Sequence, residues 1–147
     1  MMLKSTLFIV ALQLTAFVSM SQAVADDIVG VWLTTGKEPA KIQIYRSSGQ
    51  YEGKIIWLKY PTDNSKPKVD INNPDETRRN QPIIGLIILK HFKFDGDDEW
   101  EHGNIYDPES GKTYRCYLTL KDKKTLKVRG YIGISLLGRT EIWTREN

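Results

Sequence analysis

Alternation of apolar and polar side chains is clearest in the C-terminal third of the chain. In residues 114–120 the apolar positions fall on every second residue, and residues 126–132 repeat the pattern. A period of two places the apolar side chains on one face of a pleated strand. Short polar turns, such as the one at residues 107–111, join these runs and predict an antiparallel meander. Because a lone meander leaves two unpaired edges, we expect the sheet to close into a barrel or to pack as a sandwich.

Three further strands are predicted in the first half of the chain, over residues 28–34, 40–45 and 51–58. Each run is rich in β-branched, aromatic or alternating residues and ends at a turn signal. Gly53 lies inside the third run, and because glycine weakens a strand interior it predicts a bulge or a bend. The continuous apolar run at residues 83–89 is too short for a membrane helix and predicts a strand that is buried on both faces.

Residues 59–82 have a different composition, rich in proline, aspartate, asparagine and basic residues, with no period of two. They predict one long loop, which is either a functional lid or a plain crossing over one end of the sheet. Within the loop, Asn73 is an N-cap residue that is followed by Pro74 and predicts a short helix over residues 74–79. The predicted fold is therefore all-β, with about eight antiparallel strands arranged up and down in a barrel, or alternatively in a sandwich.

The first 25 residues have the features of a secretory signal peptide. Lys4 provides a short positive region, residues 7–18 form an apolar core, and an A-x-A motif ends at Ala25. We expect cleavage between Ala25 and Asp26, whereas an uncleaved membrane anchor is the less favoured alternative. The product is then a periplasmic or secreted protein with no transmembrane segment, whose residues 26–147 form a single β-barrel domain.

Composition and charge exclude further classes of protein. The chain contains 21 basic and 18 acidic residues, and these charges are spread along it, so nucleic-acid binding is not expected. Cys116 is the only cysteine, and its place on the apolar face of a strand predicts a buried, unreactive thiol. His91 and His102 lie at no metal-ligand spacing, and the oxygen-rich stretch 70–76 departs from the calcium-loop pattern. We therefore expect no metal and no cofactor.

Several short motifs cover nearly the whole chain after the signal peptide, and the most specific string runs from Ile105 to Tyr114. The motifs are residues 28–32, 53–55, 72–74, 103–108, 110–114, 129–133 and 137–140, together with Trp143. Together they resemble an exported bacterial family, the domain-of-unknown-function family numbered 2147. That family has no established activity, so the resemblance implies a fold rather than a function.

A second resemblance concerns the two ends of the predicted barrel domain. The triplet Gly30-Val31-Trp32 lies in the first strand, and Arg139 and Arg145 come late in the chain. In this respect the chain is similar to lipocalin-like, or calycin, barrels, in which a late basic residue packs across the tryptophan of a Gly-x-Trp motif. The resemblance implies an up-and-down lipocalin-like barrel in which Arg139 or Arg145 has that role, although the lipocalin disulfide is missing. Such a barrel either fills its interior with side chains or holds one small ligand in its mouth.

We interpret the protein as a binding module for a small apolar or amphipathic molecule rather than as an enzyme. There is no Gly-x-Ser-x-Gly elbow. Glu99 and Glu101 lie about 7 Å apart on one strand face, a spacing that could serve glycoside hydrolysis, but exposed glutamates are common in strands. A hydrolase is therefore the least favoured alternative. No catalytic residue is assigned. Every candidate ligand-binding residue also has a structural interpretation: a tryptophan plugs the barrel, tyrosines pack beside a hairpin, an asparagine caps a helix, and arginines are solvated. The candidates are Trp57, Asn73, Tyr106, Tyr114, Arg129 and Arg139.

The remaining alternative is an envelope interaction module with a protein partner. It would use the apolar loop at residues 134–137 and an outer face of the sheet. Loop tips are normally polar, so we expect this loop, which lies between Gly133 and Gly138, to be tucked under the long loop of residues 59–82. An exposed tip would favour the interaction module instead.

Overall fold

Residues 24–147 are the part of the chain that the computed structural model describes, and they contain ten strands and two single turns of 3-10 helix. The helical turns are η1 (Asp26–Ile28) and η2 (Glu76–Arg78). The strands are β1 (Gly30–Leu33), β2 (Ala40–Ser47), β3 (Gln50–Leu58), β4 (Thr62–Asp63), β5 (Lys66–Pro67), β6 (Ile87–Phe94), β7 (Glu99–Asp107), β8 (Lys112–Asp122), β9 (Thr125–Tyr131) and β10 (Gly138–Arg145).

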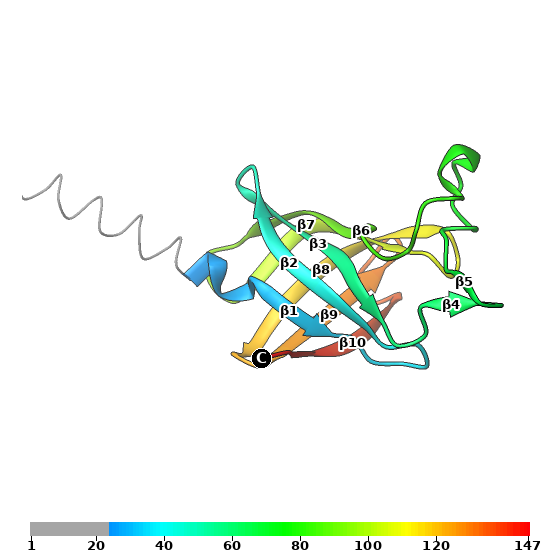
Figure 1. Cartoon of the computed structure of the whole chain (residues 1–147). Helices are drawn as coiled ribbons and strands as arrows, with labels where there is room; N and C mark the ends of the chain where they lie inside the picture. Colours follow the sequence, from blue (N-terminus) through cyan, green and yellow to red (C-terminus); the bar gives the residue numbers. More distant parts are fainter. Residues whose placement is uncertain (1–23) are drawn as a thin grey trace, which may run out of the picture.

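Eight of these strands form a closed antiparallel barrel in the order β1-β10-β9-β8-β7-β6-β3-β2 (Figure 1). The first strand pairs with both β2 and β10, so the sheet has no open edge. The predicted up-and-down barrel is confirmed, and the sandwich alternative is wrong. The predicted irregularity at Gly53 is confirmed as well, because the register between β3 and β6 shifts on either side of it. Strands β4 and β5 form a separate two-stranded ladder in the long loop, which the sequence pattern did not predict.

The register between strands decides which side chains point into the barrel. Leu126 of β9 pairs with Trp143 of β10, and Val128 of β9 pairs with Leu118 of β8. All four are buried, and directly paired residues share one face of a sheet. The even-numbered residues of β8 and β9 therefore point inward, and Cys116 is buried among them as predicted.

Tryptophans fill the end of the barrel at which β1 begins. Trp32, Trp100 and Trp143 are almost completely buried. The indole Nε1 of Trp32 donates to the carbonyl of Ile28 at 2.9 Å, and that of Trp100 donates to the carbonyl of Ala25 at 3.2 Å. These bonds hold the η1 segment against the core, so the indoles and η1 together plug this end. The interpretation of Trp32 as a plug is confirmed.

Arg145 closes the barrel between its first and last strands. Its guanidinium lies 4.2 Å from the centre of the Trp32 ring and donates to the carbonyls of Val29 and Asp27 at 2.7 and 2.5 Å. It also donates to the carbonyl of Lys123 at 2.6 Å. The late basic residue of the lipocalin-like pattern is thus Arg145 and not Arg139.

The long loop lies across the opposite end of the barrel, here called the loop end, at the right of Figure 1. It contains one turn of 3-10 helix, η2, where a longer helix over residues 74–79 was predicted. The cap is also different, because the carboxylate of Asp75 accepts the Thr77 amide at 3.0 Å, while Asn73 Oδ1 accepts the Asp75 amide at 2.9 Å. Asn73 makes a local turn instead of capping, so the helix starts two residues late and stays short.

The prediction of one buried strand over residues 83–89 is wrong in its first half. Strand β6 begins at Ile87, and the preceding residues cross the loop end. Gly85 donates to the carbonyl of Ile55 at 2.7 Å, and the Ile55 amide donates to the carbonyl of Leu86 at 2.9 Å. Ile83 is buried whereas Ile84 is exposed, so the continuous apolar run has a covered and an uncovered side.

The connection between β9 and β10, residues 132–137, is exposed and not tucked under the long loop. Leu136 and Leu137 expose 83% and 69% of their surface, and Ile134 is exposed too. The reason is that the long loop is fixed elsewhere: Asn72 Nδ2 donates to the carbonyl of Glu109 in the β7–β8 hairpin at 2.9 Å. Nothing in the described chain therefore covers these aliphatic side chains.

The predicted signal peptide falls almost entirely on residues 1–23, which lie outside the described residues. The residues that follow it belong to the barrel, since the Tyr51 hydroxyl donates to the carboxylate of Asp26 at 2.7 Å. Between residues 24 and 147 no helix has both the length and the apolar character needed to span a bilayer.

Candidate functional site

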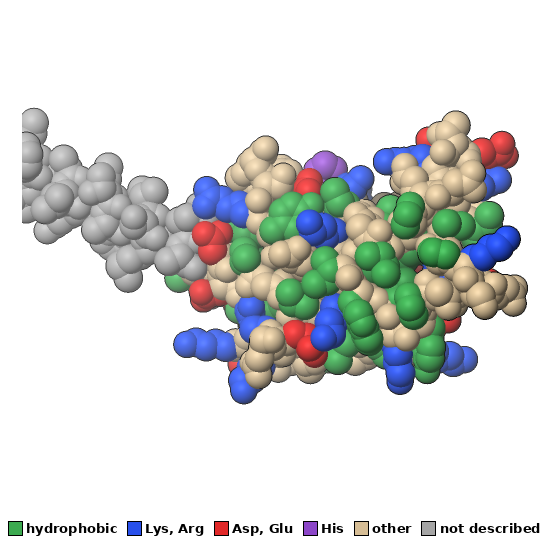
Figure 2. Space-filling view, viewed as in Figure 1, with side chains coloured by type: hydrophobic (Ala, Val, Ile, Leu, Met, Phe, Trp, Pro, Cys, Tyr) green, Lys and Arg blue, Asp and Glu red, His purple; other side chains and the backbone are tan. Residues whose placement is uncertain are grey.

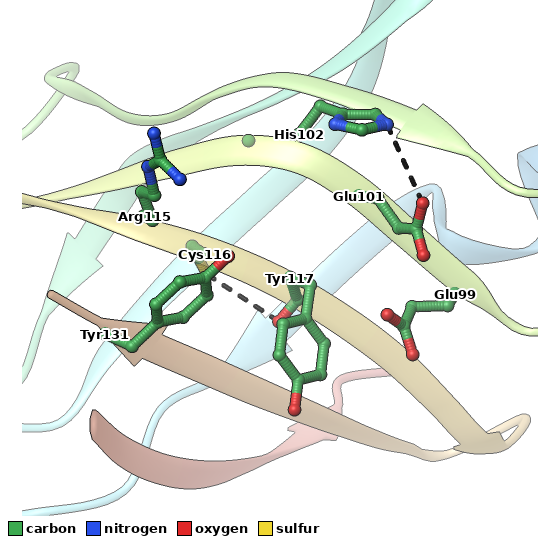
Figure 3. Close-up of a pocket in the computed structure, with 8 residues that line it drawn as sticks. Glu99, Glu101, His102, Arg115, Cys116, Tyr117 and Tyr131 are labelled. Carbon is green, nitrogen blue, oxygen red and sulfur yellow. Dashed lines mark hydrogen bonds and ion pairs between the residues drawn. The ribbon is translucent and has the colours of Figure 1, made fainter. Parts of the chain in front are cut away.

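A groove of about 480 Å³ lies on the outer face of the barrel, across β7, β8 and β9. Figure 3 shows how its residues lie: the carboxylates come from β7, and the tyrosines come from β8 and β9. We call it the β7–β9 groove. Its lining residues are Glu99, Glu101, His102, Gly103, Arg115, Cys116, Tyr117 and Tyr131.

Strand register explains why these side chains meet. Tyr131 of β9 pairs with Arg115 of β8, and Glu99 of β7 pairs with Thr119 of β8. These are odd-numbered positions, so they point away from the buried row that contains Cys116. The groove is therefore an outer surface, and it is separate from the barrel interior.

A bulge in β7 shapes one wall of the groove. The register between β7 and β8 shifts between Trp100 and Gly103, and His102 has a positive φ of 63°. Gly103 is required for space, because a Cβ there would overlap the ring of Phe92, which is fully buried. The extra residue brings Glu101 and His102 side by side, with 3.7 Å between Oε2 and Nε2.

Two tyrosines form the apolar part of the groove. The rings of Tyr117 and Tyr131 have centroids 6.2 Å apart and are tilted by 57°. Lys127 Nζ lies 5.8 Å from the centre of the Tyr117 ring, which is within the range of a cation–π contact. The two rings present flat apolar surface to anything that occupies the groove.

Charge is divided between the two ends of the groove. Partial burial and the nearby carboxylates of Glu101, Asp95 and Asp98 raise the pKa of Glu99 above its usual value, which marks a locally negative region. Arg115 lies at the other end, exposed, and forms no ion pair with any described residue. A bound molecule would therefore meet acceptors at one end and a cation at the other.

Neither an activated thiol nor a metal cluster is found in the groove among the described residues. Burial raises the pKa of the Cys116 thiol to about 12, so this side chain is not a thiolate nucleophile. Within residues 24–147 no cluster of three or more histidine, cysteine or acidic side chains is arranged to hold a metal ion. The groove offers ring contact, hydrogen bonding and charge to a bound molecule.

The six candidate residues from the sequence do not form one site. Trp57 is exposed on the outside of β3, where Lys41 Nζ lies 5.3 Å from its ring centre. Tyr114 pairs with Ile105, whose row points inward. Arg129 points outward, as in its solvated interpretation, and donates to the carbonyl of Ser135.

Arg139 lies near the mouth of the barrel. It pairs with Gly130 on the inward-facing row, but its side chain is 80% exposed and forms a 3.3 Å ion pair with Glu141. Arg129 and Arg139 are therefore on opposite faces of one hairpin and cannot hold one anion together.

Asn73 and Tyr106 do meet, at a carboxylate that is buried between the long loop and β7. Asp70 is fully buried; its Oδ2 accepts from Asn73 Nδ2 and its Oδ1 from the Tyr106 hydroxyl, both at 2.7 Å. Burial and this bond to Asp70 raise the pKa of Tyr106 to about 12. These partners satisfy each other, so the cluster attaches the loop to the barrel and does not present groups to a ligand.

The sequence pattern missed the tyrosines of the groove. Tyr117 and Tyr131 lie on the polar face of their strands, together with Arg115 and Arg129, and aromatic residues on a polar face are the available signal. Glu99 and Glu101 were noticed only as a carboxylate pair. No local pattern indicates that residues of three strands lie next to each other.

A closed eight-stranded barrel whose late arginine packs on the tryptophan of the first strand has the lipocalin-like fold. A comparison with solved structures agrees: the chain is similar, with a TM-score of 0.74 and 22% identity, to a structure described as protein HP1028 from the human pathogen Helicobacter pylori, which belongs to the lipocalin family. The similarity covers 82% of this chain and 83% of that one. This degree of identity establishes the fold alone.

Residues 30–145 match the family described as an uncharacterized protein conserved in bacteria, DUF2147, and the chain belongs to that family. Both resemblances noted in the sequence are thereby confirmed. A comparison with curated proteins finds no significant match.

Proposed function

We propose that this protein is a binding module for a small amphipathic molecule, and that the β7–β9 groove holds the ligand. The observation that carries the proposal is the composition of the groove: a volume of about 480 Å³ with two tyrosine rings between a carboxylate end and an arginine end. Ligand sites commonly have volumes of roughly 300–1,000 Å³ and combine apolar surface with a few polar groups.

The position of each group suggests its role. Tyr117 and Tyr131 would contact the flat or apolar part of the ligand. Glu99 and Glu101 would accept hydrogen bonds from hydroxyl or ammonium groups, and Arg115 would donate to a carboxylate, phosphate or carbonyl oxygen. A purely apolar ligand in the barrel interior is less well supported, because Trp32, Trp100 and Trp143 fill one end of that interior.

We further propose that the protein is exported and that cleavage occurs between Ala25 and Asp26. The proposal rests on the apolar segment and the A-x-A motif of the sequence. Mass spectrometry of the protein from a periplasmic fraction checks it, since the expected chain starts at Asp26. A chain that retains the first 25 residues would contradict it.

Native mass spectrometry of protein purified from its own bacterial cells tests the binding proposal. We expect an additional retained mass on the wild-type chain, and we expect Tyr117→Ala combined with Tyr131→Ala to lose it. Tyr60→Ala is the matched control, because Tyr60 is an exposed tyrosine stacked with Lys59 at the loop end, away from the groove. A wild-type chain without any retained mass, or a mass that persists in the double variant, would refute the assignment of the groove.

An envelope interaction module is the second candidate function. The observation that favours it is the exposure of Leu136 and Leu137, which the tucked arrangement would have covered. The two functions use different surfaces and can be tested separately.

A further inference from the structure

Aliphatic side chains gather at the exposed connection between β9 and β10. We call residues 132–137 the β9–β10 tip. Four of its six residues are large and aliphatic, and each of these exposes more than half of its surface. Figure 2 shows apolar side chains reaching the surface at this end of the molecule. The four residues are Ile132, Ile134, Leu136 and Leu137.

The backbone of the tip is held in place, so the exposure belongs to the fold. The Ile132 amide donates to the carbonyl of Leu137 at 3.2 Å, and the Leu137 amide donates to the carbonyl of Ile134 at 3.0 Å. Arg129 donates to the carbonyl of Ser135 from Nε at 3.1 Å and from Nη2 at 2.5 Å. The leucines are therefore presented outward by a formed turn, and docking would require little reorganisation.

By itself the tip is too small for a protein interface, so a protein partner would have to cover an outer face of the sheet as well. A stable protein interface buries roughly 800 Å² on each partner and uses about 20–30 residues a side. A projecting tip of four aliphatic side chains is much smaller than that. Insertion of a few apolar side chains into the interfacial zone of a bilayer, to a depth of about 5–10 Å, needs no complementary partner surface.

The basic residues near the tip favour a bilayer with anionic headgroups. No acidic residue lies between Asp122 and Glu141, and two arginines of this hairpin, Arg129 in β9 and Arg139 in β10, lie next to the tip. Anionic headgroups attract such basic segments. Acidic side chains at the same end include Asp107, whose carboxylate accepts from the Glu109 amide and the Ser110 hydroxyl of its own turn, and the exposed Glu109, Asp75 and Glu76. Lys123 and Lys124 lie in the β8–β9 turn at the plugged end, where Arg145 donates to the carbonyl of Lys123, so they do not belong to the basic group near the tip.

Tyr131, at the base of the tip, is a third feature that favours a membrane contact, beside the aliphatic and the basic residues. It points outward from the last position of β9, directly before the tip, and pairs with Arg115. Tyrosine is favoured at the headgroup level of membranes, because its ring is apolar and its hydroxyl remains hydrated. The order from the strand outward is thus basic and aromatic residues first and aliphatic residues last.

We propose that the β9–β10 tip inserts into the surface of an anionic lipid bilayer and anchors the barrel there by its loop end. This contact is reversible, since four aliphatic side chains enter only the interfacial zone of the bilayer. It shares Tyr131 with the β7–β9 groove, so its test uses substitutions within the tip alone.

Sedimentation of the mature chain, residues 26–147, with lipid vesicles tests the proposal. We expect binding to vesicles of phosphatidylglycerol and phosphatidylethanolamine, and at least tenfold weaker binding to phosphatidylcholine alone or at high salt. Leu136→Ser combined with Leu137→Ser should reduce the partition coefficient at least tenfold with an unchanged melting temperature, because both side chains are already exposed. Ile142→Ser, at an exposed aliphatic position on the side of β10, is the matched control and should bind as the wild type does.

A second measurement locates the contact. Leu136→Cys, labelled with an environment-sensitive fluorophore, should shift its emission to the blue on addition of anionic vesicles, while the buried Cys116 remains unlabelled. Absence of binding to anionic vesicles, equal binding to phosphatidylcholine, or binding that the double serine variant retains would overturn the proposal. So would a concentration-dependent dimer of the wild type that the double variant abolishes, since the tip would then serve self-association.

Discussion

Asp70 shows how a single residue attaches the long loop to the barrel. A carboxylate in the interior is unfavourable unless donors surround it, and here the donors are the Tyr106 hydroxyl and the Asn73 amide, one on β7 and one on the loop. The raised pKa of Tyr106, to about 12, keeps the phenol protonated over the physiological range, so it remains a donor.

Removal of the Tyr106 hydroxyl should destabilise the protein. In Tyr106→Phe, the buried Asp70 loses one of its donors, and we expect the free energy of unfolding to fall by about 1–3 kcal/mol. Tyr45→Phe is the control, because Tyr45 donates to Glu52, which is only half-buried, and the loss should be smaller. Urea denaturation measures both variants. Equal losses of unfolding free energy in the two variants would show that burial of Asp70 does not increase the contribution of its hydrogen bond.

Cys116 makes stability depend on pH in the alkaline range. The thiol has a pKa of about 12 in the folded chain because it is buried, against an ordinary value near 9 in the unfolded chain. Below pH 9 both states keep the proton. Between pH 9 and 12 only the unfolded state releases it, so the free energy of unfolding should fall by up to about 1.4 kcal/mol per pH unit from this group. Cys116→Ala should flatten the slope, as measured by denaturation at pH 8, 9 and 10; an unchanged slope would contradict the assignment.

At the scale of one element, the bulge in β7 shapes the candidate site. Phe92 fills the space beneath Gly103, and the extra residue in the strand turns Glu101 and His102 toward the groove. The core and the groove are thus coupled through one strand, and a change on the inner side is expected to move groups on the outer side.

Gly103→Ala should disturb both sides of β7. Its Cβ would overlap the buried ring of Phe92, so we expect a loss of about 2–3 kcal/mol and an altered near-ultraviolet circular dichroism spectrum. Gly96→Ala in the β6–β7 turn is the control, because its Cβ meets nothing within 4 Å and only the positive φ of 96° opposes it. That strain costs about 1–2 kcal/mol and should leave the aromatic spectrum unchanged. The same spectrum for Gly103→Ala as for the wild type would refute the coupling.

At the scale of the whole molecule, closure of the barrel depends on a short contact. Strands β1 and β10 share only two paired positions, Trp32 with Arg145 and Leu33 with Thr144. Arg145 strengthens this seam by spreading three donors over the carbonyls of Asp27, Val29 and Lys123. The N-terminal plug and the last strand are therefore held by one side chain.

Arg145→Lys should open this seam although the charge is kept. Lysine lacks the planar guanidinium that reaches several carbonyls and stacks on Trp32, so we expect a loss of about 2 kcal/mol or more. Arg139→Lys is the matched control, because Arg139 is exposed and has one ion pair, and the change should stay within about 0.5 kcal/mol. Thermal unfolding with hydrogen exchange at β1 measures the effect. Equal stability of the two variants would show that β1 is held by β2 alone.

Features that depend only on residues close together in the sequence could be predicted from it. The alternation in residues 114–120 predicted an inward row with Cys116 on it, and the Asp107–Gly111 stretch predicted a turn, in which Asp107 accepts the Glu109 amide at 3.0 Å. The eight strands and their antiparallel order also followed. A period of two and the chemistry of turns are local properties, so a linear chain is sufficient to read them.

Features that join distant segments were decided by the tertiary structure. The groove needs the register of three strands, and the exposure of Leu136 depends on where the long loop is anchored, through Asn72 and the buried Asp70. The run at residues 83–89 looked like one strand, but hydrogen bonds to Ile55 turned its first half into a crossing. Each outcome depends on which groups satisfy one another across the fold, and many such pairings are compatible with the same local pattern until the barrel closes.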